Sequence, residues 1–234
     1  MIKYNNYDFQ KLSEEFSSLK ASSLLKIMIK KVFKKKIVVT SSFGAESIVI
    51  LDLVSKIDRS IPIIFLDTEK LFPETLDYLK KVRKLLKLTK IKVQKPNKND
   101  LKKNDPKGML YKKDPELCCK IRKVIPFEKS IAPYDALING RKRFHGFDRE
   151  NIKKIEKINN IVRINPLADW TFKNITNYID KNNLPEHPLV KQGYKSIGCS
   201  PCTSKVADDE PHRSGRWKKL KKNECGINVF NPSI

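Results

Sequence analysis

The 234-residue sequence lacks any run of 18 uncharged apolar residues, so we expect no membrane-spanning helix and no membrane partner. Its first residues, MIKYNNYDFQKLSEEF, lack the apolar core and small-residue cleavage site of a secretory signal peptide. It also has no internal repeat and no low-complexity linker. We therefore expect a cytoplasmic protein that buries a substantial core without disulfides. Its five cysteines should stay reduced and serve a metal site or catalysis.

Acidic residues are scarce relative to basic ones: 26 Asp and Glu stand against 49 Lys and Arg, a formal net charge of +23. A basic face that binds nucleic acid is one interpretation. We favour a general enrichment in lysine, because lysines are spread over the whole chain and only nine basic residues are arginines. Five of these fall in CCKIRK, GRKR and HRSGR, and their planar forks suit phosphate or sulfate. We therefore do not expect nucleic acid as a partner, and part of the charge should attract a small anionic substrate.

Short β-branched runs alternate with helical patterns through the middle of the chain. Strands are predicted within KKIVVTSS, IPIIFLDTE, TKIKVQKP, YDALINGRKR and NIVRINPLADW. Helices are predicted within residues 8–35, GAESIVILDLVSKI, PETLDYLKKVRKLLK, PELCCKIRKVIPFEKSI and, with Thr171 as cap, TFKNITNYIDKNN. This order predicts an α/β fold with a doubly wound, mostly parallel sheet. Residues 95–113 are polar and are expected to form a mobile loop without an assigned role.

A loop of small residues, TSSFGAES at residues 40–47, follows the first expected strand. Ligands of open α/β sheets bind beyond the carboxyl ends of strands, and backbone N–H groups at a helix N-terminus suit an anion. The loop has no Gly-Lys-Ser/Thr and so is not a Walker A motif. Its spacing resembles the SGGxDS loop of adenine-nucleotide pyrophosphatases, with Phe43 in place of a glycine and Glu46 in place of the aspartate. A purely structural turn is the alternative. The candidate binding residues are Ser41, Ser42, Phe43, Gly44 and Ser47.

The second expected strand ends at Asp67 in FLDTE. A carboxylate there can accept hydrogen bonds from ribose hydroxyls or from an adenine edge. Alternatively, Asp67 or Thr68 caps the helix that begins at Pro73. The local sequence leaves both interpretations open.

Four cysteines form a doubled pair, Cys118 and Cys119, and a CxxC pair, Cys199 and Cys202. A CxxC is a common half of a metal site. Adjacent cysteines do not clamp one tetrahedral ion comfortably, but they can bind two different irons of a cube. Four cysteinates are the usual ligands of a [4Fe–4S] cluster, so this cofactor is favoured over zinc. Four unrelated buried thiols are the remaining alternative.

The fifth cysteine, Cys225, lies in NECGIN within a basic segment that includes Arg213, Arg216, Lys221 and Lys222. Positive neighbours favour the thiolate, which makes Cys225 a candidate nucleophile. An idle exposed thiol is the alternative. Two further basic motifs, GRKRFHG and HRSGRW, suit phosphate or sulfate oxygens, or else form a solvated basic face. The histidines at 145, 187 and 212 are not at metal-ligand spacing, so none is interpreted as a zinc ligand.

Together, SFGAES, LDT, CC, GRKRF, CSPCT, RSGRW and ECGI resemble the assimilatory adenylylsulfate (APS) reductases, the iron–sulfur branch of the phosphoadenylylsulfate (PAPS) reductase family. The resemblance covers residues 35–230. It implies an adenine-nucleotide α-hydrolase-like sheet and the reduction of APS to sulfite and AMP, in sulfate assimilation and cysteine biosynthesis. It also implies thioredoxin or glutaredoxin as the electron donor, while the sequence leaves open whether the chain forms a homo-oligomer.

The resemblance also assigns roles to residues. Cys225 would attack the sulfate sulfur and form an S-sulfocysteine, while Cys118, Cys119, Cys199 and Cys202 would hold a [4Fe–4S] cluster. Lys123 would link cluster and substrate sulfate. The nucleotide would meet the loop at 41–47 and Asp67, and the anion would meet Arg141, Arg143, Arg213 and Arg216. One catalytic domain is expected, with N-terminal helices at 1–35, a nucleotide-binding core at 36–184, and a cluster-binding, mobile catalytic tail at 185–234.

Two departures from the family pattern accompany this interpretation. Asn228 stands where the family usually ends ECG(I/L)H, and LDTE replaces the more usual LDTG. Alternatives remain open: a PAPS reductase or an enzyme of dual specificity, a tRNA thiolase with a similar loop, and a zinc-stabilised basic RNA-binding protein. The doubled cysteine argues against the cluster-free PAPS reductases and against the tRNA thiolases, whose cysteines normally come as paired CxxC.

Overall fold

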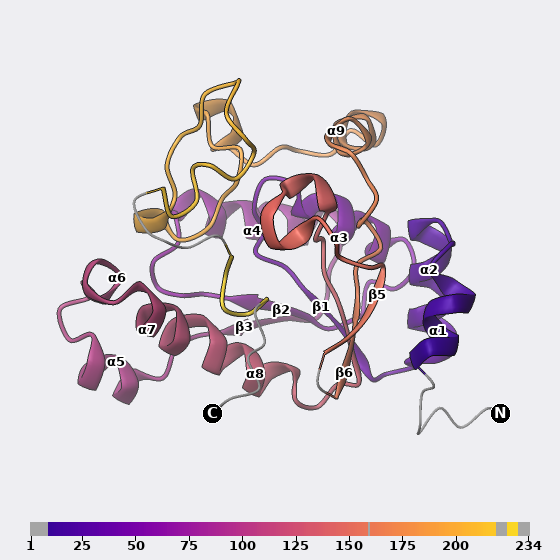
Figure 1. Cartoon of the computed structure of the whole chain (residues 1–234), viewed down its shortest axis with the longest axis horizontal. Coiled ribbons are helices and arrows are strands. Elements are labelled where there is room, and N and C mark those ends of the chain that lie inside the picture. Colours follow the sequence, from indigo (N-terminus) through magenta and orange to yellow (C-terminus); the bar gives the residue numbers. More distant parts are fainter. Residues whose placement is uncertain (1–8, 159, 219–223, 229–234) are drawn as a thin grey trace.

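The computed structural model describes residues 9–158, 160–218 and 224–228 and contains a six-stranded sheet (Figure 1). The strand order is β3-β2-β1-β4-β6-β5, and every neighbouring pair is parallel except β5 with β6. The strands are β1 (Ile37–Thr40), β2 (Ile63–Leu66), β3 (Ile91–Gln94), β4 (Ala136–Ile138), β5 (Ile155–Ile158) and β6 (Ile161–Ile164). The predicted doubly wound, mostly parallel α/β fold is therefore confirmed.

The central strands β1, β2 and β4 are almost entirely apolar because helices cover both faces of the sheet. Val38 and Val39 are neighbours in β1 and point to opposite faces, yet both are 0% exposed. In the edge strand β3, apolar residues alternate with polar ones in the sequence IKVQ, and the strand is only partly buried. This difference explains why the sequences of these central strands are nearly continuous apolar runs.

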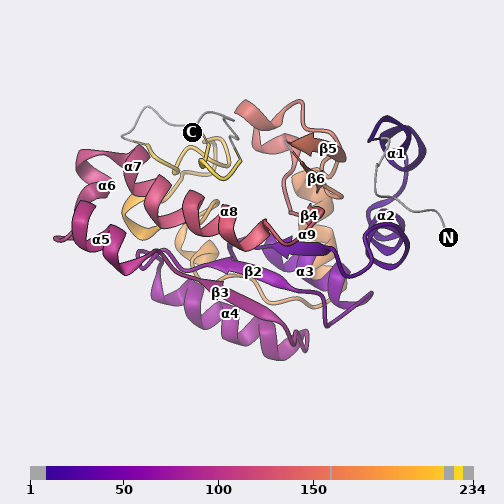
Figure 2. The ribbon, with the colours of Figure 1, turned by 90° about the horizontal axis from the view of Figure 1, so that it is seen from below.

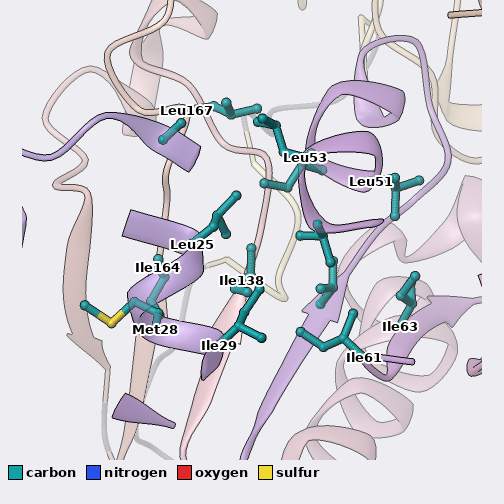
Figure 3. Packing of buried hydrophobic residues seen from close by; sticks show 14 of the residues in the cluster. Leu25, Met28, Ile29, Leu51, Leu53, Ile61, Ile63, Ile138, Ile164 and Leu167 are labelled. Carbon is teal, nitrogen blue, oxygen red and sulfur yellow. The ribbon is translucent and has the colours of Figure 1, made fainter. Parts of the chain in front are cut away.

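The larger core cluster lies on one face, where α3, α4 and α9 pack with the N-terminal helices (Figures 2 and 3). The close view shows Leu25, Met28 and Ile29 directed toward Ile138 and Ile164 of the sheet. A smaller cluster on the other face joins α8 to β1, β2 and β4. These helices are α1 (Phe9–Phe16), α2 (Ala21–Ile27), α3 (Ser47–Ser55), α4 (Pro73–Leu85), α8 (Ile125–Ile131) and α9 (Phe172–Lys181).

Two helical segments contain a π-helical turn. One turn, Met28–Val32, continues α2. The other, Lys120–Val124, joins α7 (Pro115–Cys119) to α8, so the predicted helix across PELCCKIRKVIPFEKSI is continuous but not α-helical throughout. The expected cap of α9 is also present: Thr171 and Asn174 form a reciprocal capping box.

Residues 95–113 do not form the expected structureless loop. They contain α5 (Lys98–Asn104), capped by the Asn97 side chain, and α6 (Leu110–Lys113). α5 has no buried residue, so its sequence carries no apolar stripe by which to predict it. A buried ion pair between Asp105 and Arg122 ties this segment to the helix that carries the doubled cysteine.

The tail after α9 has little regular structure, as expected. Its described part contains the short 3₁₀ turns Val190–Gln192 and Ser200–Cys202, and two isolated bridges, Leu71 with Cys199 and Thr203 with Arg216. Two further 3₁₀ turns, Arg143–His145 and Phe147–Arg149, follow β4. None of the helices in the described part of the chain combines the length and apolar character that a bilayer-spanning helix needs.

Candidate active site

A cavity of about 240 Å³ lies where β1 and β4 end. Thr40, the last residue of β1, and Asn139, which follows β4, form part of its wall. The tail covers it, with residues 195–199, 213, 216, 217, 224, 225, 227 and 228 in its lining. Ligands of open α/β sheets bind at this edge, which makes the cavity the candidate active site.

The loop after β1 reaches the cavity through four of its five candidate residues: Ser41, Ser42, Gly44 and Ser47. The fifth, Phe43, adopts a left-handed backbone (φ 48°) and turns its fully buried ring onto Phe65, with centroids 5.5 Å apart. Phe43 therefore anchors the loop from behind. Gly44 is needed for close approach, since a Cβ there would lie 3.2 Å from the Ile197 carbonyl oxygen.

Two other candidates lie outside this cavity lining. Asp67 accepts a hydrogen bond from the Glu69 N–H at 3.0 Å and faces Lys95 at 3.4 Å. The cap of α4 is Phe72, without a side-chain bond, so the capping interpretation of Asp67 or Thr68 is wrong. Arg143 is exposed and donates to the Ile152 carbonyl oxygen at 2.9 Å. These contacts hold their own loops together.

A cationic wall lines the cavity with Lys123, Arg141, Arg213 and Arg216. Within the described part of the chain, the Nε atoms of Arg141 and Arg216 are buried without a hydrogen-bond partner. Buried donors normally find partners, so these two indicate space for an acceptor. Burial, reinforced by the Arg149 charge, lowers the pKa of Arg213 to about 10, which still leaves it charged at neutral pH.

Cys225 is 9% exposed and lines the same cavity as Lys123. Although burial by itself lowers the pKa of Lys123, the sulfurs of Cys199, Cys225 and Cys119 raise it above its usual range. The ammonium group therefore stays charged between three cysteines. Lys221 and Lys222, the other expected basic neighbours of Cys225, lie outside the described residues.

A second, much smaller cavity is lined by all four remaining cysteines, Cys118, Cys119, Cys199 and Cys202. Lys123, Trp217 and Cys199 itself line both cavities, so the cysteine set directly adjoins the larger one. Burial and the neighbouring Cys119 raise the pKa of the Cys118 thiol to about 11. Burial also acts to raise the pKa of Cys199. The net pKa is nevertheless lowered, because the charge of Lys123, a hydrogen bond with Thr68 at 3.1 Å and the charge of Arg216 outweigh burial.

A buried polar network whose pairings were not predicted from the sequence lies beside the cavity. Glu46 is paired with Lys142 at 2.5 Å, and His145 Nε2 lies 3.1 Å from its carboxylate. His145 Nδ1 lies 3.0 Å from Arg149 Nη1 and must accept its proton, because a guanidinium only donates. His145 is thus the neutral Nε2–H tautomer, and burial, opposed by Glu46, lowers its pKa to about 4.

Glu46, His145 and His212 form the one group of three potential metal ligands within 4.8 Å among the described residues. Two observations speak against a cation there. Lys142 already occupies the Glu46 carboxylate, and His145 would have to give up its Nε2 proton while still accepting from Arg149 at Nδ1. The group is better described as an ion-paired wall of the cavity. The sequence offered one indication of this group: Glu46 stands where the loop pattern has an aspartate.

A second unpredicted pairing joins Arg149 to Glu224, whose side chain is 3% exposed. Arg149 Nη2 donates to Glu224 Oε1 at 3.1 Å, and so does Arg213 Nη2. Burial opposes ionisation of Glu224, but Arg149 and Arg213 lower its pKa well below its usual range. The two partners are 75 residues apart in the chain, so no local pattern connects them.

Residues 36–205 match the family model described as phosphoadenosine phosphosulfate reductase domain. A protein of Mesorhizobium japonicum named adenosine 5'-phosphosulfate reductase is 42% identical over 92% of this chain and 84% of its own. The chain belongs to the phosphoadenosine phosphosulfate (PAPS) reductase family. A second such reductase, from Chelativorans, is 40% identical over 93% of this chain and 89% of its own.

Solved structures agree with this family membership. The crystal structure of a PAPS reductase from Candida auris, in a phosphate complex, superposes with a TM-score of 0.69 at 28% identity. It covers 85% of this chain and 96% of that one. Yeast FAD synthetase shares the fold alone, with a TM-score of 0.55 at 15% identity over 84% of this chain and 74% of that one. The expected relation to adenine-nucleotide α-hydrolase-like enzymes is therefore confirmed at the level of the fold.

The departure at position 228 from the usual family ending lies inside the site. Asn228 lines the cavity, and its backbone N–H donates to the Cys225 carbonyl oxygen at 2.8 Å. The turn that follows the cysteine is thus closed by a main-chain bond, which any residue except proline at 228 can make. Asn228 replaces an imidazole by an amide within reach of the same cavity.

Proposed function

We propose that the protein reduces APS to sulfite and AMP with electrons from a thiol protein such as thioredoxin or glutaredoxin, in assimilatory sulfate reduction. The observation that carries the proposal is Cys225, a cysteine that faces a cavity walled by Lys123 and arginines. Relatives named adenosine 5'-phosphosulfate reductase, two of them 42% and 40% identical, support APS as substrate. A reducing compartment such as the cytoplasm suits a mechanism that depends on free thiols.

The nucleotide is proposed to bind at the loop of Ser41, Ser42, Gly44 and Ser47, with Phe43 supporting that loop. The sulfate would then lie toward Arg141, Arg213 and Arg216, whose guanidinium groups can each offer two parallel hydrogen bonds. Asp67 and Arg143, which lie outside the cavity lining, fit only a supporting role for the loops that carry them. We treat residues 36–184 as the core of this single catalytic domain and 185–234 as its tail.

In the first step the Cys225 thiolate attacks the sulfate sulfur. An S–S bond forms, the S–O bond to the phosphate breaks, and its electron pair leaves with AMP. Both partners are negatively charged, so the approach is electrostatically unfavourable. Lys123 and the arginines offset that repulsion and stabilise the charge that develops on the leaving phosphate.

In the second step a donor thiolate attacks the Cys225 sulfur. The S–S bond to the sulfonate breaks, its electron pair leaves with sulfite, and a mixed disulfide remains. The donor's second thiol then reduces that disulfide and restores Cys225. Two electrons pass from the donor dithiol to sulfur, which balances the reduction of sulfate to sulfite.

We propose a [4Fe–4S] cluster as cofactor, held by Cys118, Cys119, Cys199 and Cys202. The donor set fits, because all four thiols line one small cavity. The arrangement disfavours zinc, because a tetrahedral zinc with bonds of about 2.3 Å needs sulfurs roughly 3.8 Å apart. Among the described residues no three cysteine sulfurs gather within 4.8 Å. When bound, the cluster would tune the electrostatics of the adjacent substrate site.

The test is anaerobic purification followed by iron analysis, a visible spectrum and sulfite release from APS and from PAPS with thioredoxin. We expect iron for one [4Fe–4S] cluster per chain, and sulfite from APS in preference to PAPS. Cys225→Ser should keep the iron and the spectrum but release no sulfite. Full-rate sulfite release by that variant would refute the nucleophile, and reduction of PAPS alone would refute the substrate.

A further inference from the structure

The residue before the proposed nucleophile is tied to two parts of the site at once. The Glu224 carboxylate accepts from Arg149 and from Arg213, and it also accepts from the Cys225 backbone N–H at 2.8 Å. Glu224 and Arg213 are 6% and 8% exposed, so water competes little for these bonds. The carboxylate therefore fixes the main chain at Cys225 relative to the cavity wall.

Arg149, one of the two arginines that bind the Glu224 carboxylate, is itself held in place. Arg149 donates to His145 Nδ1 at 3.0 Å, and His145 Nε2 donates to Glu46 at 3.1 Å. Glu46 belongs to the loop after β1 and lines the cavity. A continuous series of hydrogen bonds therefore runs from that loop to the backbone of Cys225.

The two half-reactions make opposite demands on Cys225. In the first step its sulfur must lie in the cavity, which is how the structure holds it. In the second step the thiol of another protein must reach that sulfur, and a side chain that is 9% exposed inside a covered cavity is out of its reach. The segment must be held for one step and released for the other.

We propose that Glu224 is a positioning residue: it latches the Cys225 segment onto Arg149 and Arg213 for attack on the substrate, and the latch opens before the donor thiol attacks. The proposal rests on the two-step function proposed above. Glu224 touches no reacting atom. It acts through the backbone N–H of Cys225 and through the orientation of two arginines.

Glu224→Gln tests the latch, because glutamine keeps the shape but removes the charge that two guanidinium groups require. Glu224→Asp keeps the charge on a shorter side chain, and Arg149→Gln removes the partner on the other side. Glu210→Gln is the matched control. Glu210 lies in the same tail and is also paired with a basic residue, Lys218 at 2.9 Å, but the pair is at the surface.

Three measurements are made on the holoenzyme. The first is alkylation of Cys225 by iodoacetamide without substrate, mapped by peptide mass spectrometry. The second is AMP release in a single turnover without donor, which reports sulfonation of Cys225. The third is sulfite release when thioredoxin is added to the isolated S-sulfonated enzyme.

For Glu224→Gln we expect faster alkylation, sulfonation slowed on the order of 10²-fold, as a displacement of about 1 Å can cause, and sulfite release unchanged or faster. Glu224→Asp should recover part of the sulfonation rate. Arg149→Gln should also speed alkylation, and adding it to Glu224→Gln should change alkylation little further, because both remove the same latch. Glu210→Gln should match the wild type in all three measurements.

Wild-type alkylation in both Glu224→Gln and Arg149→Gln would overturn the latch, and so would equal slowing of the two half-reactions by Glu224→Gln. If Glu224→Gln does not fold, Glu224→Asp and Arg149→Gln still decide the alkylation result. Failure of the proposed function looks different: the wild type would form no S-sulfonated Cys225 with APS. The alkylation measurement needs no substrate and would still test whether Glu224 holds the segment.

Discussion

Gly198 provides a test of the cationic wall, because its missing side chain makes room for Arg216. A Cβ on Gly198 would lie 2.2 Å from Arg216 Nη2 and 2.3 Å from Cζ and Nη1. Such distances are impossible, so in Gly198→Ala something must move. The colliding atoms are the far end of a long side chain, which can swing away. We therefore expect the variant to fold while Arg216 leaves its place against the cavity.

The expected loss follows from what Arg216 offers the substrate. A hydrogen bond to a charged group contributes about 1.5–3 kcal/mol, and each 1.4 kcal/mol is a factor of ten. Loss of one such bond should lower kcat/KM for sulfite release from APS about 10- to 150-fold. Thermal unfolding should change little, because the Arg216 guanidinium can move toward solvent. Steady-state assays and a melting curve on the same preparation check both expectations.

The decisive comparison uses Arg216→Ala as background. If Gly198→Ala acts by displacing the guanidinium, it should have almost no further effect once Arg216 has been truncated, since nothing is left to collide with. An equal loss in both backgrounds would show that the alanine acts in some other way, for example through the neighbouring Cys199. An unchanged kcat/KM in the single variant would refute a role for Arg216 in holding the substrate.

Three further predictions concern stability. His187 accepts from the Leu189 N–H at Nδ1, and burial lowers its pKa to about 4. Between pH 6.5 and 4 the unfolded chain therefore binds more protons than the folded chain, so the free energy of unfolding should decrease as the pH is lowered through that window. In urea titrations this decrease should be roughly 1–2 kcal/mol larger at pH 5 for the wild type than for His187→Gln. Arg122→Ala leaves Asp105 buried without its partner and should cost about 3–5 kcal/mol in urea unfolding, against much less for Arg122→Ala with Asp105→Ala. Thr171→Ala removes the capping box of α9 and should cost about 1 kcal/mol, and a loss below the error of a melting curve would contradict that reasoning.

The fold could be predicted because its central strands are buried on both faces, which forces continuous apolar runs such as IVVT and IIFL. Elements that bury little could not be predicted in this way. Helix α5 has no buried residue, and β5 pairs with β6 as an antiparallel edge strand. Their sequences carry little of the apolar periodicity on which prediction depends.

The same distinction applies to the site. Ser41, Ser42, Gly44 and Ser47 were found because a loop after a strand is a local pattern. The partners of Glu224 were not, because Arg149 precedes it by 75 residues and only the folded tail brings them together. Sequence motifs identified chemical groups, whereas the pairing of buried charges depends on contacts that no short window contains.

The doubled cysteine shows how local geometry and the proposed cofactor fit together. Adjacent residues of a helix point about 100° apart, so Cys118 and Cys119 diverge from one backbone position. Both nevertheless line the same small cavity as Cys199 and Cys202. The π-helical turn that begins at Lys120 widens the helix one residue after the pair, as such turns often do at functional sites, and Lys123 within it lines both cavities. An iron–sulfur cube offers two separate binding atoms to two diverging sulfurs, whereas a single zinc ion offers one, which supports the [4Fe–4S] cluster proposed above.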